Sequence, residues 1–170
     1  AIGLFLAKEF AQKGNSVLLL EKKEKIGGKV CSGLVSQNIF KYIPEKDVDF
    51  FLEKEIKGAR LWIEESPFFF KGKALLFHRD KFDEYLYKEA LKSGANIILG
   101  QRIINVLEHS EFIEIFSEEG KTFKGKILAG CDGAVSLVAK RVGLPPPKNL
   151  LLGVVAYSDK KRKKDEDFVE

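Results

Sequence analysis

Two acidic residues of this chain each follow an apolar run that is typical of a buried strand. Glu21 follows Val17 to Leu20, and Asp132, which precedes Gly133, follows Lys126 to Gly130. A carboxylate at the carboxyl end of a parallel strand can accept hydrogen bonds from the hydroxyl groups of a ribose or a sugar alcohol. The two motifs therefore favour a nucleotide site, whereas a solvated charge run after Glu21 and an ordinary Asp-Gly turn are the alternatives.

The element that must position Glu21 is a helix before the strand. Apolar residues at helical spacing predict a helix that ends before Gly14, and they are Leu4, Phe5, Ala7, Phe10 and Ala11. Gly3, preceded by Ala1 and Ile2, stands where the last glycine of a G-x-G-x-x-G phosphate-binding loop belongs. We therefore expect the first strand and the first two glycines of that loop to precede residue 1.

The rest of the chain reads as further helices and strands separated by turn signals. We expect short helices within residues 37–57, then strands at Ala59–Glu64 and Lys73–His78 with a turn near Pro67 and Gly72. A helix capped by Asp80 and ending before Gly94 should follow, then a strand at Asn96–Leu99 and an antiparallel meander at Ile103–Leu107, Phe112–Phe116 and Thr122–Phe123 with a turn at Glu119-Gly120. The last expected elements are a strand at Lys126–Gly130, a helix over Ala134–Val142, a strand at Leu151–Tyr157 and the start of a strand at Phe168-Val169.

This order of elements predicts an α/β fold, namely a Rossmann-like nucleotide-binding domain with a small antiparallel meander and part of a second sheet. Ligands of open α/β sheets lie across the carboxyl ends of the strands. We therefore expect Val17–Glu21, Asn96–Leu99 and Lys126–Gly130 to be parallel strands of one sheet, with Glu21 and Asp132 at the same edge.

The composition limits the classes of partner and site. The net charge is +4 with basic and acidic residues interspersed, which predicts no nucleic-acid partner. Two separated cysteines and two histidines without ligand spacing predict no metal site. No apolar run approaches the length of a membrane span. The two separated cysteines make a reducing, cytoplasmic setting the default expectation. The charged run Asp159 to Asp167 reads as a solvated loop, with a patch that contacts a membrane surface as the alternative.

Several of these motifs, taken in order, resemble the FAD-binding half of the hydroxybenzoate-hydroxylase-like flavoproteins. The matching segments are the helix from Gly3 to Gly14, the strand ending on Glu21, the turn at Gly27-Gly28, Arg79 to Asp83 before a helix, and Ala129 to Ala134. Within that group, Lys29 to Ser36 is most similar to the geranylgeranyl reductase family. Two positions depart from the family pattern, Val135 in place of Asn and Ala139 in place of Arg.

The resemblance implies FAD as the cofactor and assigns roles to particular residues. The residues that it places against FAD are Ala1, Ile2, Gly3, Glu21, Lys22, Gly28, Arg79, Ile103, Asp132 and Gly133. Among them, Glu21 would hold the adenosine ribose, Arg79 would lie near the phosphate and ribityl region, and Ile103 would flank the adenine. Cys31 falls where the reductases keep a cysteine beside the flavin ring, and the alternative for Cys31 is a small buried side chain.

The same resemblance implies a division of the chain and an activity. Residues 1–36 would be FAD-binding, 37–78 an excursion into the substrate domain, 79–144 FAD-binding again, and 145–170 the start of the substrate-domain sheet. The implied reaction reduces carbon–carbon double bonds of a polyprenyl chain on a lipid or lipid precursor, with hydride from flavin and a proton from a donor near Cys31.

Two other functions and several details stay open at this point. An FAD-dependent monooxygenase of the same fold is one alternative, and a non-catalytic flavin- or nucleotide-binding fragment is another. The electron donor, NAD(P)H or ferredoxin, is not specified by the sequence. The isoprenoid substrate makes a peripheral membrane contact an option, and we expect the isolated chain to be inactive.

Overall fold

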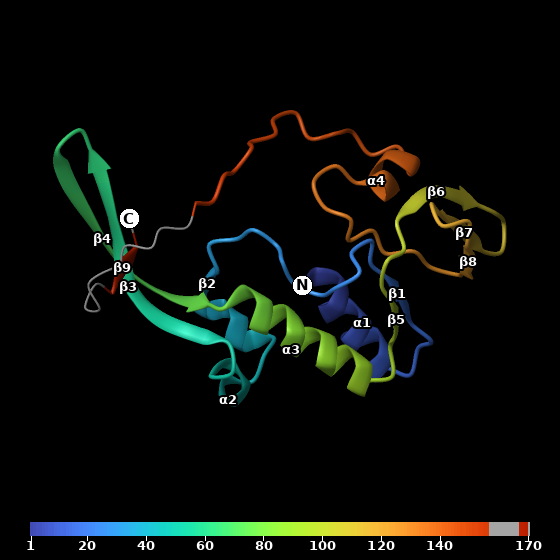
Figure 1. The fold of residues 1–170 in the computed structure, drawn as a ribbon, viewed down its shortest axis with the longest axis horizontal. Helices are drawn as coiled ribbons and strands as arrows, with labels where there is room; N and C mark the ends of the chain where they lie inside the picture. Colours follow the sequence, from blue (N-terminus) through green and yellow to red (C-terminus); the bar gives the residue numbers. More distant parts are fainter. Residues whose placement is uncertain (157–166, 170) are drawn as a thin grey trace. The chain divides into compact units, whose positions relative to one another are not determined.

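The structure is a computed structural model that describes residues 1–156 and 167–169. The chain divides into two compact units, unit 1 with Ala1–Ile26 and Leu86–Leu152, and unit 2 with Gly27–Tyr85 and Gly153–Glu170. The elements, labelled in Figure 1, are α1 (Ile2–Gln12), β1 (Leu18–Leu20), β2 (Leu34–Ser36), the 3₁₀ helix η1 (Gln37–Lys41), α2 (Glu45–Val48), β3 (Leu52–Ile63), β4 (Ser66–Phe77), α3 (Arg79–Lys92), β5 (Asn96–Ile98), β6 (Ile103–Glu108), β7 (Ile113–Ser117), β8 (Thr122–Gly125), α4 (Leu137–Arg141) and β9 (Phe168–Val169).

Unit 1 contains a short parallel sheet. Strands β1 and β5 pair in parallel, with Leu18 opposite Asn96 and Leu20 opposite Ile98. The Asn96 N–H donates to the Val17 carbonyl at 2.9 Å, and the Glu21 N–H donates to the Ile98 carbonyl at 3.0 Å. The expected parallel pairing of these two segments is therefore confirmed, and it ends on Glu21.

Small side chains let the helices of unit 1 lie close to this sheet. A buried cluster consists of alanines from α1, from the second half of α3 and from the turn after α3, with apolar residues of β1 and β5 packed against it. Its members are Ala7, Ala11, Ala90 and Ala95, and the packed residues are Val17, Leu19 and Ile97.

The antiparallel meander of unit 1 is also confirmed. Ile115 of β7 lies opposite Val106 of β6 on one side and Phe123 of β8 on the other. The turn between β7 and β8 needs a glycine, because Gly120 has φ +78°. Hydrogen bonds from the Ser117 N–H to the Lys121 carbonyl, and from the Lys121 N–H to Ser117 Oγ, close this turn.

The third expected parallel strand, Lys126–Gly130, is wrong. These residues form no regular strand, and Ile127 is 86% exposed. A strand needs a hydrogen-bonded neighbour, and no strand among residues 1–156 and 167–169 pairs with this segment. The expected strand at Leu151–Tyr157 is wrong for the same reason over residues 151–156, which form no strand and are exposed, whereas residue 157 lies outside the described residues.

The helix expected over Ala134–Val142 is shorter in the structure. Ser136 has extended backbone, and its Oγ accepts from the Ala139 N–H, so it acts as the N-cap. The helix therefore begins only at Leu137, where α4 starts.

Unit 2 is built on a long β-hairpin. Strands β3 and β4 have twelve residues each and join through a turn at Glu64-Glu65, where Glu64 has φ +53°. The expectation of two short strands with a turn near Pro67 and Gly72 is wrong, because Pro67 pairs with Trp62 near the hairpin end and the ladder continues past it. The short helices expected within residues 37–57 are present as η1 and α2, but the residues from Leu52 onward belong to strand β3.

The core of unit 2 is a cluster of aromatic rings under this hairpin. The Phe51 side chain is fully buried and meets the rings of Phe77, Phe82 and Tyr85 at centroid distances of 4.7, 5.1 and 5.2 Å. Edge-on and tilted contacts of this kind add to the hydrophobic gain. The Tyr85 hydroxyl donates to Asp47 Oδ2 at 2.9 Å, which ties α3 to α2.

The end of the described chain joins the sheet of unit 2. Strand β9 pairs in parallel with β3, with Phe168 opposite Gly58, so the expected strand start at Phe168-Val169 is confirmed. Asp167 forms ion pairs with Lys57 at 2.6 Å and Lys54 at 3.4 Å. The rest of the charged run, up to residue 166, lies outside the described residues.

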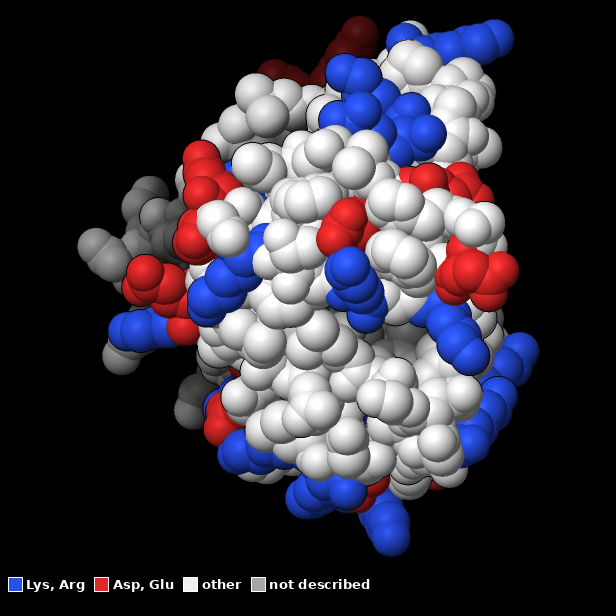
Figure 2. All heavy atoms as spheres, turned by 90° about the vertical axis from the view of Figure 1, so that its right-hand side faces the viewer, with Lys and Arg blue, Asp and Glu red and all other residues white. Residues whose placement is uncertain are grey.

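Both signs of charge occur across the face of the molecule drawn in Figure 2. Among the described residues, no helix has the length and apolar character needed to cross a membrane.

The aromatic core predicts a large effect of one truncation. Phe51→Ala should lower the free energy of unfolding by about 3–5 kcal/mol, because it removes a buried ring and leaves a cavity. Urea denaturation followed by circular dichroism measures the change. Phe68→Ala serves as the matched control, because Phe68 is half-exposed, and should change stability by less than about 0.5 kcal/mol. Equal losses for the two variants would contradict this account of the core.

Candidate functional site

The residues expected to contact a cofactor or substrate fall into both units. Unit 1 holds Ala1, Ile2, Gly3, Glu21, Lys22, Ile103, Asp132 and Gly133, and unit 2 holds Gly28, Cys31 and Arg79.

Helix α1 begins at Ile2, directly after its N-cap residue Ala1. Its N-cap, Ala1, contributes no side-chain hydrogen bond, so the side chain does not compete for the N–H groups of the first turn. Such N–H groups favour an anion. A Cβ on Gly3 would lie 3.4 Å from Cys131 Cβ and 3.6 Å from Leu19 Cδ1. Both distances are ordinary van der Waals contacts, so Gly3 packs against Cys131 and Leu19, and its expected place in a phosphate-binding loop stays a prediction.

Glu21 is held at the end of β1 by its neighbours. Its carbonyl accepts from the Gln101 N–H at 2.9 Å, and its Oε1 accepts from the Lys23 N–H at 3.0 Å. Oε2 accepts no hydrogen bond from the described residues, so one carboxylate oxygen remains for a sugar hydroxyl. The next side chain, that of Lys22, is exposed.

Gln101 is a residue that the sequence analysis missed. It is 6% exposed, and its Oε1 has no hydrogen-bond partner among the described residues, although its amide nitrogen donates to the Gly100 carbonyl at 2.9 Å. A buried acceptor without a partner is costly and uncommon. Gln101 lies two residues before Ile103, which opens β6 opposite Ser117. No sequence signal distinguishes a single glutamine in a loop.

Asp132 caps the helix that follows it. Its Oδ1 accepts from Ser136 Oγ at 2.5 Å, and its Oδ2 accepts from the N–H groups of Leu137 at 2.6 Å and Val138 at 3.2 Å. Partial burial alone would raise the pKa of Asp132, but these hydrogen bonds outweigh it and hold the pKa below its ordinary value. Gly133, with φ +93°, supplies the left-handed conformation that this turn requires.

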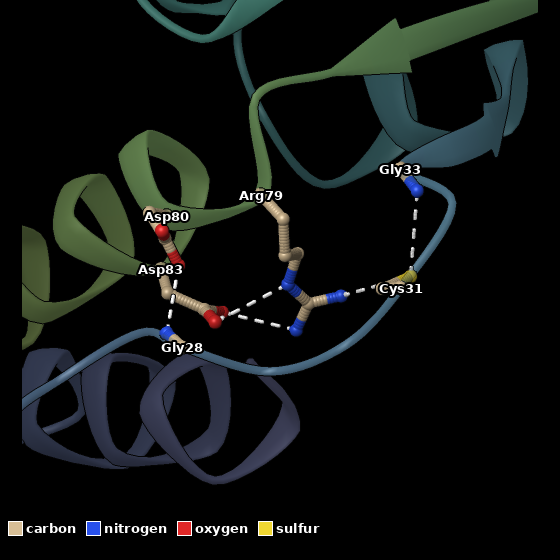
Figure 3. Close-up of polar contacts among 6 residues, drawn as sticks. All are labelled: Gly28, Cys31, Gly33, Arg79, Asp80 and Asp83. Atoms are coloured by element: carbon tan, nitrogen blue, oxygen red, sulfur yellow. Dashed lines mark hydrogen bonds and ion pairs between the residues drawn. The ribbon is translucent and has the colours of Figure 1, made fainter. Parts of the chain in front are cut away.

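In unit 2, Cys31 lies between two hydrogen-bond donors (Figure 3). Its exposed Sγ accepts from the Gly33 N–H at 3.5 Å and from Arg79 Nη1 at 4.0 Å. The expectation that Arg79 lies near the phosphate and ribityl region of a cofactor stays a prediction, and its guanidinium Nη1 faces the cysteine sulfur.

Asp83 fixes the position of the Arg79 guanidinium. Its two oxygens accept from Arg79 Nε at 3.2 Å and Nη2 at 3.0 Å, and Asp83 is only 5% exposed. Burial of the guanidinium alone would lower the pKa of Arg79, but the hydrogen bonds and charge of Asp83 outweigh it and raise the pKa above its ordinary value. The sequence analysis did not assign Asp83 a role, although its spacing of four residues from Arg79 on a helix is a usable signal.

The Gly27-Gly28 turn rests on Asp80, whose expected role as an N-cap is wrong. Helix α3 already begins at Arg79, and Asp80 Oδ1 accepts from the Gly28 N–H at 2.7 Å. Gly27 has φ +93°, and a Cβ there would lie 2.8 Å from the same oxygen. The turn therefore depends on glycine for both conformation and space.

These residues border a cleft of about 410 Å³ within unit 2. It is lined by Gly28, Lys29, Val30, Cys31, Ser32, Glu53, Phe77, His78, Arg79 and Asp80. A thiol, a guanidinium and apolar side chains thus share one concave surface, which is the usual setting of a small-molecule site.

Comparison with known proteins places this geometry in context. No family model matches the chain. A digeranylgeranylglycerophospholipid reductase of Picrophilus torridus is 27% identical over 192 aligned residues, which cover 99% of this chain and 46% of that protein. The expected resemblance to geranylgeranyl reductases is therefore confirmed, and the chain spans less than half the length of this relative.

Solved structures with the same fold include flavoproteins of different activity. Halogenase PltM, solved in complex with phloroglucinol and FAD, is 16% identical, has a TM-score of 0.68, and the match covers 86% of this chain and 35% of PltM. A geranylgeranyl bacteriochlorophyll reductase-like protein of Thermoplasma acidophilum is 24% identical, has a TM-score of 0.58, and the match covers 71% of this chain and 33% of that protein. The chain thus has the mixed α/β, Rossmann-like fold of FAD-binding flavoproteins, as expected.

The cap formed by Asp132 predicts a pH-dependent helix end. The pKa of Asp132 in the folded protein lies below its ordinary value. The carboxylate therefore stabilises the helix end fully at pH values above the ordinary pKa, and this stabilisation is lost as the pH falls through the lower pKa of the folded protein. At neutral pH, Asp132→Ala should speed hydrogen exchange of the Leu137 and Val138 amides by about three- to tenfold, as expected for a lost cap of roughly 1 kcal/mol. In acid the difference from the wild type should disappear.

Exchange of these two amides is measured by NMR across the pH range. Glu111→Ala removes another exposed carboxylate of unit 1 and should leave both rates unchanged. A pH-independent effect of Asp132→Ala would mean that the carboxylate charge does not contribute to the cap.

Proposed function

We propose that this protein is an FAD-dependent oxidoreductase that reduces carbon–carbon double bonds in the polyprenyl chain of a lipid or lipid precursor. The observation that carries the proposal is the exposed Cys31 thiol, which lies at the wall of a cleft between two hydrogen-bond donors. The relative named digeranylgeranylglycerophospholipid reductase supports the reaction class.

The residues of unit 1 fit FAD. The first turn of α1, where Ala1 forms no side-chain cap, suits a pyrophosphate, and Glu21 Oε2, which accepts no hydrogen bond from the described residues, suits a ribose hydroxyl. Asp132 fits a ribityl hydroxyl less simply, because both of its oxygens already accept hydrogen bonds from its own helix. We therefore expect Glu21 to contribute more than Asp132 to the affinity for FAD.

Reduction of an alkene requires a hydride for one carbon and a proton for its neighbour. Bound FAD, once reduced, supplies the hydride. In our proposal the Cys31 thiol supplies the proton, because it is an exposed acid on the cleft wall. The Gly33 N–H helps to orient Sγ, since it donates to the sulfur from two residues along the chain.

An apolar groove in unit 2 supports a hydrocarbon substrate. Its volume is about 200 Å³, and small residues form much of it, which leaves room for a flexible chain. The lining residues are Leu34, Ile56, Gly58, Ala59, Phe70, Lys71, Gly72, Lys73, Ala74 and Val169. A polyprenyl chain offers no hydrogen-bonding atoms, so contact with such side chains is what it requires.

Removal of the Glu21 carboxylate should weaken FAD binding. Loss of a charged hydrogen bond is worth roughly 1.5–3 kcal/mol, so Glu21→Ala should raise the Kd for FAD about ten- to a hundredfold. A fluorescence titration of this protein with FAD measures the change. Glu24→Ala, three residues further along, removes the same charge and should leave the Kd unchanged. An unaltered Kd for Glu21→Ala would refute the ribose contact.

The decisive experiment concerns Cys31. In a preparation that reduces a polyprenyl lipid, Cys31→Ala should keep flavin content and flavin reduction but slow product formation by roughly 10²–10⁴-fold, the usual contribution of a positioned acid. Cys31→Ser should keep part of the rate through its hydroxyl. Single-turnover kinetics with absorbance for the flavin and mass spectrometry for the lipid separates these steps.

Two results would overturn the proposal. One is product formation by Cys31→Ala at the wild-type rate, and the other is oxygen uptake coupled to a hydroxylated product, which is the behaviour of a monooxygenase.

A further inference from the structure

The outer half of the β3–β4 hairpin carries apolar side chains that the proposed reaction does not yet use. Among the described residues, β2 pairs with β4 only from Ala74 to Leu76, and β9 pairs with β3 only at Gly58 and Ala59. Beyond those points the two strands of the hairpin pair only with each other (Figure 1). The large apolar side chains there are all about half-exposed, namely Leu61, Trp62, Ile63, Phe68, Phe69 and Phe70. A cluster of exposed apolar side chains of this size indicates a binding surface.

The pairing register places some of these side chains on one face of the hairpin. In an antiparallel ladder, directly opposite residues point to the same face, and successive pairs alternate between the two faces. Leu61 lies opposite Phe68, and Ile63 lies two residues further along β3 on the same face. These three residues, Leu61, Ile63 and Phe68, are called the apolar stripe.

The apolar stripe continues the groove of about 200 Å³ in unit 2. Ala59 and Phe70 line that groove and lie opposite each other, one pair inward from Leu61 and Phe68 on the same face. Val169 of β9, which pairs with Ala59, also lines the groove. Groove and stripe therefore form one continuous apolar surface.

The groove alone is too small for a polyprenyl chain. An apolar cavity of about 150 Å³ holds one benzene ring, so a groove of about 200 Å³ has room for roughly eight carbon atoms. A geranylgeranyl chain has twenty carbons. More than half of such a chain must therefore lie outside the groove, either in water or on another apolar surface.

We infer that the apolar stripe binds the part of the polyprenyl chain that the groove cannot hold, so that the protein selects long chains over short ones. The inference rests on the proposed function, which supplies a hydrocarbon substrate. The stripe is two strands wide, and neighbouring strands lie about 5 Å apart, which suits a single hydrocarbon chain. The charged turn at Glu64-Glu65 ends the stripe, because hydrocarbon gains nothing from contact with hydrated carboxylates.

Binding of two soluble probes tests the inference without turnover. Isothermal titration calorimetry of this protein with geranylgeranyl diphosphate and geranyl diphosphate compares a long and a short chain with the same headgroup. Excess inorganic pyrophosphate occupies any site that recognises the headgroup alone. The wild type should bind the longer chain at least about tenfold more tightly, because the additional carbons leave water when they contact the stripe.

A charge on the stripe should abolish this preference. Leu61→Glu should raise the Kd of the longer probe about tenfold, since its carboxylate must stay hydrated, and that of the shorter probe by less than about twofold. Leu61→Ala, which removes apolar area without adding a charge, should raise the Kd of the longer probe about threefold.

Trp62→Glu is the matched control. Trp62 follows Leu61 directly and is 50% exposed against 51% for Leu61, but it pairs with Pro67 on the opposite face. The same charge there should change both Kd values by less than about twofold. Circular dichroism should give the same spectrum for all variants, because both positions are half-exposed.

The outcomes separate this inference from the proposed function. Equal affinity of the wild type for the two probes, or binding of neither, would overturn the inference. Equal losses in Leu61→Glu and Trp62→Glu would also overturn it, and would instead indicate a lipid surface that meets both faces of the hairpin. A chain-length preference that Leu61→Glu abolishes, combined with full turnover by Cys31→Ala, would support the inference and overturn proton donation by the cysteine.

Discussion

The ion pair between Asp83 and Arg79 is the interaction on which the cleft of unit 2 depends. Asp83 is almost fully buried, and a buried carboxylate persists as a charge only when a cation and hydrogen-bond donors accompany it. Arg79 satisfies that requirement from the first turn of the same helix, so the guanidinium cannot be placed freely. The position of the positive charge next to Cys31 therefore follows from the need to pair the buried carboxylate of Asp83.

A second constraint fixes the backbone beside this pair. Asp80 lies on the same helix turn and binds the Gly28 N–H, and only glycine fits the conformation and space at position 27. The segment from Gly28 to Cys31 therefore starts from a point anchored to α3. In unit 1, alanines from α1, α3 and the turn after α3 form a buried cluster against β1 and β5, and hydrogen bonds from the N–H groups of Gln101 and Lys23 hold Glu21 at the end of β1.

The sequence predicted the elements whose partners are close in the chain or strongly patterned. The parallel pairing that ends on Glu21, the meander with its turn at Gly120, and the helix after residue 78 all carry a periodicity or a glycine that local rules can read. Lys126–Gly130 has the composition of a buried strand but forms none, because composition cannot say whether a neighbouring strand is present to pair with it.

In the candidate site, too, some residues could be predicted from local sequence patterns and others only from the folded structure. Glu21, Cys31 and Asp132 could be singled out by residue type and by the turns around them. The direction of the Arg79 side chain could not, because it depends on the burial of Asp83, which only the folded structure determines. The unpartnered oxygen of Gln101 is similarly invisible in a sequence, where one loop glutamine resembles any other.

The pairing of Trp62 with Pro67 near the hairpin end has a practical consequence for spectroscopy. Trp62 is the single tryptophan of the chain, and it is half-exposed on β3, away from the aromatic cluster around Phe51. Its emission should therefore be shifted to the red even in the native state and should respond to changes in the outer hairpin. Melting of the alanine-lined sheet in unit 1 would pass almost unseen in tryptophan fluorescence, so that intrinsic emission reports on one arm of unit 2 and not on the fold as a whole.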